Sequence, residues 1–413
     1  MRGEVLSLSA LFFVAVLFSP APGQAFTDWQ SEDTSVSLRG FTGLGGSYNR
    51  NPEAAALYDS REDLLWDLDQ RLLVAAKYRE NARFDLNLLQ NIRATPSPVF
   101  GVRPAGVERS GLLSWQQHAG GNSEANLSVD TAAFHYVQQN IEWSFGRQPV
   151  NLATTTYFSP NDFFAPFAAQ TFYRVYKPGV DSARAEVRLG NLAQLSLIGV
   201  LGYSPESTTD TDWRNRPDWS RNSLLARVAV NRNDWEWGLL GGTVREHRIT
   251  GGSLQGEFFD WLGVRAEGHY AAPEQDGLSG WAEVSAGIEH RFADSLELRL
   301  EQFHHGQGYS SSEALSQALV SGNLAEGYTG RDYTALGASY EFSPLLTGQA
   351  LLLANWSDHS QLLSLNGVYS LSNEAELAVT LALPRGEHAE NGFGGSEFGL
   401  VPVTLACTFR VYY

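Results

Sequence analysis

The chain has 413 residues and a formal net charge of −17, with 29 basic and 46 acidic side chains. Only Lys77 and Lys177 are lysines, and such an acidic, lysine-poor chain is poorly suited to neutralising the phosphates of a nucleic acid. The single cysteine, Cys407, excludes an intramolecular disulfide, and without a CxxCH motif the chain attaches no c-type haem itself.

The first 25 residues have the plan of a secretory signal peptide. Arg2 is followed by an apolar run over 5–18, and small residues at Gly23 and Ala25 precede the expected cut. The apolar run is shorter than the roughly 20 residues that a membrane-spanning helix needs, which argues against an anchor. We therefore expect an exported protein whose mature part is 26–413.

Short segments of strict alternation run through the mature chain. In WDLDQRLLVAAKY, Trp66 and Leu72 lie on one face and Asp69 and Arg71 on the other. A period of two is typical of a β-strand between two different environments. A soluble β-sandwich also alternates, so the pattern alone does not decide the fold. Further examples are 83–93, 183–189, 296–301, 376–383 and the C-terminal VPVTLACTFRVYY at 401–413.

The connections between these segments alternate in length. Eight tight turns are expected at 80–82, 138–140, 190–191, 231–234, 259–261, 293–294, 343–346 and 372–374. Nine other connections, mostly longer, are expected at 49–62, 95–124, 151–180, 204–220, near 247–248, 273–280, 306–330, 357–360 and 386–396. Short turns on one side and long loops on the other favour an all-β fold, a transmembrane antiparallel up-and-down β-barrel. The count gives 18 strands with both termini on the periplasmic side, although 16 strands remain an alternative.

The segment 401–413 reads as the closing strand of the barrel. Its odd-numbered positions are all apolar or aromatic, from Val401 to Tyr413, and would face lipid. A C-terminal strand that ends in an aromatic residue resembles the signal that the barrel-assembly machinery of Gram-negative bacteria recognises. We therefore expect a protein of the bacterial outer membrane, in contact with its lipid.

The stretch 151–180 is unusually aromatic for a loop that faces water. We expect it to fold into the barrel and narrow the pore; the alternative is a plug that only seals the fold. The predicted constriction residues are Tyr157, Phe158, Asp162, Phe163, Phe164 and Phe167.

A family resemblance rests on Gly146, Arg147 and Gln148, followed by SPNDFFAP with Asp162 at its centre. This pattern is similar to the strand end and Asp-containing, Pro-flanked loop of Gram-negative porin-like families, which include alginate-export-like and other substrate-specific 18-strand barrels. The match covers about 40 residues. The resemblance implies the architecture of these barrels and does not indicate a substrate.

The alternation places many charged side chains on the inner face of the barrel, where they must meet water or pair with one another. They would form a selectivity field for the solute or, alternatively, a structural charge network. The predicted pore-lining residues are Arg71, Arg83, Asp85, Glu142, Arg184, Glu186, Arg188, Arg227, Arg265, Glu267, Glu283 and Arg299.

The sequence thus predicts an outer-membrane, porin-like channel for passive diffusion of small polar or charged solutes. The main alternative is a barrel that sheathes multihaem cytochromes in a porin–cytochrome electron-transfer conduit; a further one is a structural or adhesive barrel with a plugged lumen. HExxH and GxSxG motifs are absent, and we expect neither an enzyme nor a cofactor or metal site.

Overall fold

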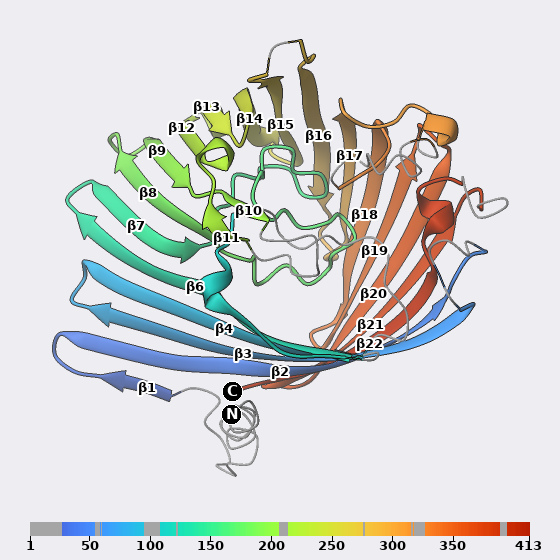
Figure 1. The fold of residues 1–413 in the computed structure, drawn as a ribbon, viewed down its shortest axis with the longest axis horizontal. Helices are drawn as coiled ribbons and strands as arrows, with labels where there is room; N and C mark the ends of the chain where they lie inside the picture. The colour runs from blue at the N-terminus through green and yellow to red at the C-terminus, as the bar shows by residue number, and fades with distance from the viewer. Residues whose placement is uncertain are drawn as a thin grey trace.

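In the computed structural model, the chain forms a closed antiparallel barrel of 18 strands (Figure 1). The structure describes residues 27–413 except 54–57, 59, 95–107, 121–122, 206–213, 276, 315–316, 318–326 and 389–394. The predicted signal peptide and parts of the long loops lie outside the described residues. The barrel strands are β2 (Thr34–Arg50), β3 (Glu62–Tyr78), β4 (Ala82–Ala94), β6 (Ser123–Gln138), β7 (Ile141–Gln148), β8 (Val180–Arg188), β9 (Ala193–Val200), β12 (Ser223–Arg232), β13 (Trp235–Val244), β14 (His247–Phe258), β15 (Leu262–Pro273), β16 (Trp281–Arg291), β17 (Glu297–His305), β18 (Asp332–Ser343), β19 (Leu346–Asn355), β20 (Ser360–Ser372), β21 (Ala375–Arg385) and β22 (Val403–Tyr412).

The barrel closes between its first and last strands. β2 pairs with β22 from Phe41 opposite Tyr412 to Arg50 opposite Val403, and the backbones of Gly40 and Tyr413 add two hydrogen bonds of 2.6 and 2.9 Å. Closure leaves no strand edge unpaired in the hydrocarbon, where lipid offers no hydrogen bonds. The C-terminal segment therefore forms the seam of the barrel.

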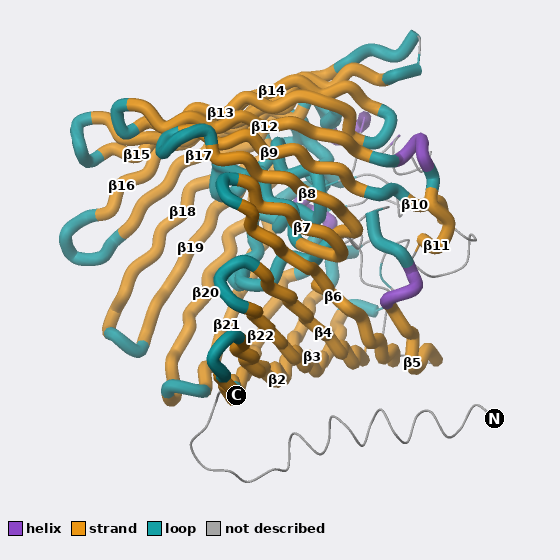
Figure 2. The backbone as a smooth tube through the Cα atoms, turned by 90° about the vertical axis from the view of Figure 1, so that its left-hand side faces the viewer, coloured by secondary structure: helices purple, strands orange, loops and turns teal. Residues whose placement is uncertain are grey.

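The predicted strand count is confirmed, and the alternative of 16 strands is wrong. One end of the barrel carries eight short turns, and the longer connections gather at the other end (Figure 2). Several turns use residues with positive φ, such as Asn233 (52°) and Asp234 (64°), as tight hairpins require. The turns are 79–81, 139–140, 189–192, 233–234, 259–261, 292–296, 344–345 and 373–374.

Short additional strands and 3₁₀-helices lie at the ends of the barrel. β1 (Thr27–Gln30) pairs with the start of β2, and β5 (Ser114–Gly120) pairs with β6. A hairpin of β10 (Tyr203–Pro205) and β11 (Arg214–Pro217) belongs to the loop between β9 and β12. The 3₁₀-helices are η1 (Gly111–Leu113), η2 (Trp219–Arg221) and η3 (Phe398–Leu400).

The two faces of the sheet differ as the alternation predicted. Along β22 the odd-numbered side chains, such as Leu405 and Phe409, are exposed on the outside and the even-numbered ones are partly covered. Large apolar side chains are exposed around the wall, among them Leu44, Leu64 and Leu239. This outer surface suits lipid rather than water. No helix among the described residues is both long and apolar enough to cross a membrane.

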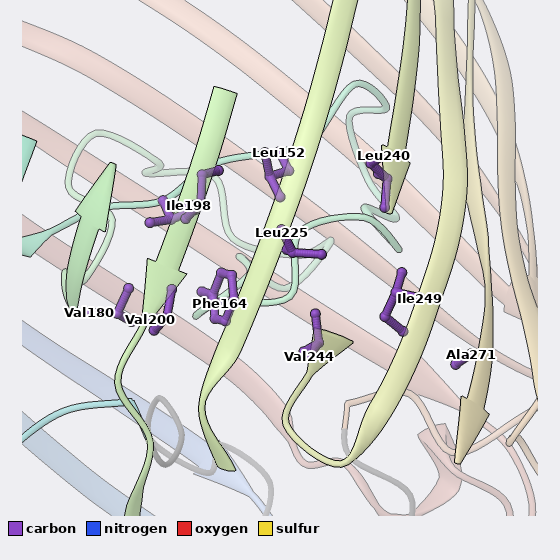
Figure 3. Close-up of a cluster of buried hydrophobic side chains, with 11 residues drawn as sticks. Leu152, Phe164, Val180, Ile198, Val200, Leu225, Leu240, Val244, Ile249 and Ala271 are labelled. Carbon is purple, nitrogen blue, oxygen red and sulfur yellow. The ribbon is translucent and has the colours of Figure 1, made fainter. Parts of the chain in front are cut away.

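The buried apolar side chains gather between the inner wall and the loop that joins β7 to β8, residues 149–179, which lies inside the barrel (Figure 1). One cluster joins this loop to β8–β15 (Figure 3) and contains Val150, Leu152, Phe164, Val180, Ile198, Val200, Leu225, Leu240, Val244, Ile249 and Ala271. The other joins it to β17–β20 and η3 and contains Phe158, Ala169, Phe303, Tyr333, Ala335, Leu351, Leu353, Leu362 and Phe398.

Candidate constriction site

The two ends of the 149–179 loop, hereafter the lumen loop, are joined by a buried ion pair. Arg147 at the end of β7 is 1% exposed and contacts Asp181 at the start of β8 through Nε–Oδ1 (2.7 Å) and Nη2–Oδ2 (3.1 Å). Gly146 makes this possible, because its φ is +114° and a Cβ there would lie 2.2 Å from the Ala132 carbonyl oxygen. The bidentate pair fixes where the loop leaves and rejoins the wall.

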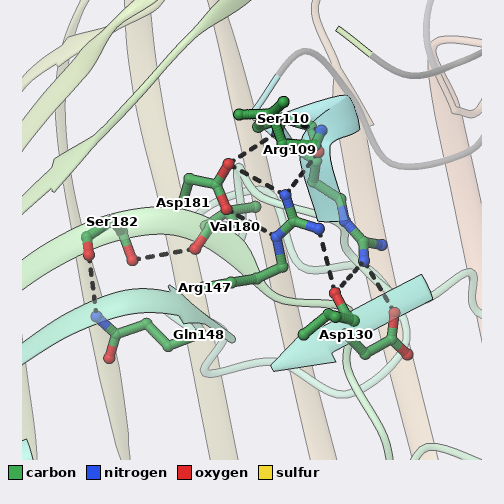
Figure 4. A network of polar contacts seen from close by, with 10 residues as sticks. Arg109, Ser110, Asp130, Arg147, Gln148, Val180, Asp181 and Ser182 are labelled. Carbon is green, nitrogen blue, oxygen red and sulfur yellow. Dashed lines mark hydrogen bonds and ion pairs between the residues drawn. The ribbon is translucent and has the colours of Figure 1, made fainter. Parts of the chain in front are cut away.

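A second buried pair extends this anchor (Figure 4). Asp130 on β6 accepts from Arg71 Nη1 at 2.7 Å and from Arg109 Nη2 at 2.9 Å. Arg147 also donates to the carbonyl oxygens of Val129 (3.1 Å) and Ser110 (2.8 Å). Burial lowers the pKa of Arg109, although the Asp130 carboxylate opposes that shift. Arg71, a predicted pore-lining residue, is therefore largely occupied by a structural contact.

Two wall carboxylates hold the lumen loop by its backbone. Glu301 on β17 accepts from the backbone N–H groups of Thr156 (2.7 Å), Tyr157 (2.8 Å) and Phe158 (3.1 Å). Glu267 on β15 accepts in the same way from Thr154, Thr155 and Asn161. Each carboxylate is 3% exposed and replaces the water that these amides would otherwise need.

The loop also has charged contacts of its own. Lys177 donates to Asp162, and both side chains are buried. Burial raises the pKa of Asp162, against the opposing effect of Lys177, and burial lowers the pKa of Lys177. Arg174 donates to the carbonyl oxygens of Thr171 and Ala169, both at 2.7 Å. Asp162, a predicted constriction residue, thus stabilises the loop from within through its ion pair with Lys177.

The predicted aromatic residues divide by environment. Phe158 and Phe164 are almost fully buried in the two apolar clusters, and Phe163 packs edge-on against His269 with ring centroids 4.9 Å apart. Tyr157 and Phe167 are partly exposed. The two buried rings hold the loop to the wall and do not border open space.

The predicted pore-lining charges mostly form pairs on the inner wall. Arg265 and Arg299 share Glu289 at 2.9 and 2.7 Å. Other pairs are Arg83–Asp85 (2.5 Å), Arg227–Glu236 (3.0 Å), Glu283–His305 (2.9 Å), Glu142–His135 (3.8 Å) and Arg184–Glu186 (3.7 Å). Arg188 is exposed at the turn end of β8 and is not brought together with the others.

A polar cavity of about 180 Å³ lies where the lumen loop meets β2, β3 and β22. Asp69, Gly43 and Arg410 lie opposite one another across the three strands, so the glycine leaves the floor of the cavity open. Tyr173 and Tyr176 of the loop cover it, with the guanidinium of Arg410 3.9 Å from the ring centre of Tyr173.

In this cavity the two arginines have carboxylate partners, whereas the two aspartates have no ion pair among the described residues. Arg71 is paired with Asp130, and Arg410 Nη1 donates to Glu376 at 2.7 Å. Asp69 accepts only from Asn91, and Asp67 makes no hydrogen bond or ion pair in the described part of the chain. No sequence pattern distinguishes Tyr173, Tyr176, Arg410 or Glu301 from their neighbours, because their roles depend on contacts across the lumen. The described residues contain no group of three or more His, Cys, Asp or Glu that could hold a metal ion.

Comparisons with known proteins return structural similarity only. No protein-family model matches the chain, and no curated protein matches it in sequence. The fold is similar to OccK9 (OpdG) of Pseudomonas aeruginosa, with a TM-score of 0.57 and 14% identity over 92% of this chain and 99% of that one. It is also similar to P. aeruginosa OccK2 (OpdF), with a TM-score of 0.56, 14% identity and coverage of 92% and 98%. Acinetobacter baumannii OccAB4 gives a TM-score of 0.55, 9% identity and coverage of 93% and 99%.

The chain therefore has the fold of the substrate-specific outer-membrane porins, an 18-stranded barrel with a lipid-facing exterior. At 9–14% identity the similarity establishes this fold and leaves the solute open.

Proposed function

We propose that this protein is an outer-membrane channel for the passive diffusion of small polar or charged solutes, with the lumen loop as its constriction. The observation that carries the proposal is the attachment of this loop to the inner wall by Glu267 and Glu301, each through three backbone N–H groups. A loop held across a wide polar lumen narrows it at one level, where a solute meets fixed charges.

The predicted inner-wall charges would set the selectivity of this route, with the cavity at Asp67, Asp69, Arg71 and Arg410 at its narrow part. Export by the signal peptide 1–25 and assembly through the C-terminal strand belong to the same proposal. No observation on the described residues or in the comparisons favours the sheath for multihaem cytochromes.

The test is single-channel conductance in planar bilayers, on protein whose absorbance spectrum is free of haem. Deletion of 155–172 should raise the conductance step. Because this deletion removes apolar packing, the double variant Tyr173→Ala/Tyr176→Ala, which trims only the cover of the cavity, should raise it as well. The proposal would be contradicted if correctly folded wild-type protein did not conduct, or if the conductance step were unchanged in both variants.

A further inference from the structure

A groove of about 960 Å³ lies on the outside of the barrel wall. It lies over β6–β9, β12 and β13, near the ends that carry the long loops. Phe145, Ala183, Gly199, Leu224 and Thr243 lie opposite one another along the five strands β7, β8, β9, β12 and β13. Phe145 is 48% and Leu224 66% exposed, so this row faces away from the lumen.

Strand length and side-chain size explain the hollow. β7, β8 and β9 have eight or nine residues, about half the length of β2 and β3, so the wall is low here. Ala183 and Gly199 add little volume to the floor. The short helices η1 and η2 lie at the loop end of the wall, on either side of this region (Figure 2), and both contribute to the lining.

These two short helices direct large apolar side chains into open space. Leu112 of η1 is 76% exposed and Trp219 of η2 is 79% exposed, and both line the groove together with Leu201. These two side chains and the apolar floor form a continuous apolar patch, and such a patch marks a contact with another apolar molecule.

The position of the groove on the barrel wall indicates which kind of molecule occupies it. The outward-facing Tyr270 lies opposite Thr250, which in turn lies opposite Gly241, two residues before Thr243 of the groove. Exposed aromatic side chains near strand ends mark the level where headgroups give way to acyl chains. Barrel strands are tilted, so paired residues differ in height, but Tyr270 and the groove both lie toward the strand ends that carry the long loops, on the lipid-facing side of the wall.

The polar groups at the base of the groove are already engaged with one another. Arg147 is paired with Asp181, Ser223 Oγ accepts from Arg245 N at 3.0 Å, and Asn222 Oδ1 accepts from Gly202 N at 2.8 Å. The surface left for a ligand is mainly apolar. We propose that this groove binds an acyl chain of an outer-leaflet membrane lipid, held between η1 and η2.

A glycine pair provides the test. A side chain at Gly199 would meet only the Ala183 carbonyl oxygen, at 4.0 Å, so Gly199→Leu fills the groove without backbone strain. Gly367 on β20 also faces lipid and has no atom within 4 Å of an added Cβ, so Gly367→Leu is the matched control. Wild-type protein and both variants are purified in detergent, washed at length, and their retained lipid is quantified by mass spectrometry.

We expect wild type and Gly367→Leu to retain the same lipid, and Gly199→Leu to retain less by about tenfold, since a few lost methylene contacts suffice for that factor. Equal retention in all three proteins would overturn the proposal. Loss of a dimer or trimer in Gly199→Leu, without loss of lipid, would overturn it in favour of a second copy of the chain as occupant.

A second measurement does not depend on retention during purification. The protein is placed in vesicles of phospholipid brominated on the acyl chain, and bromine quenches the fluorescence of a tryptophan that it contacts. The contribution of Trp219 is the difference in fluorescence between wild type and Trp219→Phe, and we expect this contribution to be quenched. This quenching should shrink in Gly199→Leu and persist in Gly367→Leu. Absence of quenching at Trp219 would refute acyl contact, whereas an altered conductance of Gly199→Leu would show that the groove belongs to the solute route.

Discussion

Arg147 and Asp181 form a bidentate ion pair, in which the Arg147 side chain is fully buried and the Asp181 side chain is 15% exposed, and it joins the end of β7 to the start of β8. The lumen loop begins and ends at this pair, so its two ends are held together independently of its contacts with the opposite wall. Buried charges are costly unless paired and fully hydrogen-bonded, and here the remaining donors of Arg147 reach the Val129 and Ser110 carbonyl oxygens. The pair thus has a geometric role that an exposed salt bridge would not fulfil.

Replacement of Arg147 by methionine should destabilise the barrel strongly. The change leaves the Asp181 carboxylate in a buried site without its partner, and breaking a buried pair typically costs about 3–5 kcal/mol. We expect a clear fall in the temperature at which the folded form is lost on semi-native gels.

The control for this change is Arg61→Met, which breaks the exposed Arg61–Glu53 contact. Exposed pairs contribute about 0–1 kcal/mol, so this variant should behave as wild type. Similar behaviour of both variants would show that the buried pair does not carry the stability assigned to it.

Glu301→Gln should loosen the lumen loop, because a neutral amide accepts more weakly than a carboxylate from the three N–H groups of 156–158. Glu297→Gln removes the same charge from the same face of β17 without touching the loop. We expect larger fluctuations of the open-channel current in Glu301→Gln than in Glu297→Gln. Equal noise in both variants would mean that charge alone, and not loop attachment, is being measured.

The packing of 395–402 should respond to pH through Glu397. Its side chain is partly buried among Tyr333, Asn355, Thr329 and Asp358, and desolvation raises the pKa of its carboxyl group above the usual value. The packed segment then binds the proton more tightly than the unpacked one, so packing is favoured at low pH and weakened as pH rises through this raised pKa.

Hydrogen exchange of 395–402 at pH 5 and pH 8, corrected for the intrinsic rate, checks this expectation. Protection should fall with pH in wild type and change little in Glu397→Gln, which has no proton to lose. Protection that rises with pH in wild type but not in the variant would show that the sign is wrong.

The barrel could be predicted from the sequence because its causes are local. Alternation along 66–78 or 401–413 identifies a strand, and the contrast between two-residue turns and long loops orients it. The aromatic content of 151–180 predicts an inward fold. Each of these signals lies within about 30 residues of chain.

The individual roles at the site could not be predicted, because they depend on contacts across the lumen. Glu297, Arg299 and Glu301 alternate identically, and only the folded loop distinguishes the carboxylate that it uses. Arg147 belongs to the motif that the sequence shows, but its ion pair with Asp181 depends on the backbone at Gly146, whose φ is +114°. Lys177 lies 15 residues from Asp162, and no local pattern links the two side chains.

Ion selectivity provides the last prediction. Asp67 and Asp69 are the incompletely paired charges of the cavity beside Tyr173 and Tyr176, whereas Arg71 and Arg410 have carboxylate partners. Unpaired carboxylates at a narrow point raise the local concentration of cations. The double variant Asp67→Asn/Asp69→Asn should therefore shift the reversal potential in a KCl gradient towards the anion, with the permeability ratio falling by about a factor of two or more. Asp260→Asn removes a charge in the turn 259–261, outside the lumen, and should leave the ratio unchanged. A shift of equal size in Asp260→Asn would assign selectivity to the net charge of the protein, and no shift in the double variant would place the selective charges elsewhere on the inner wall.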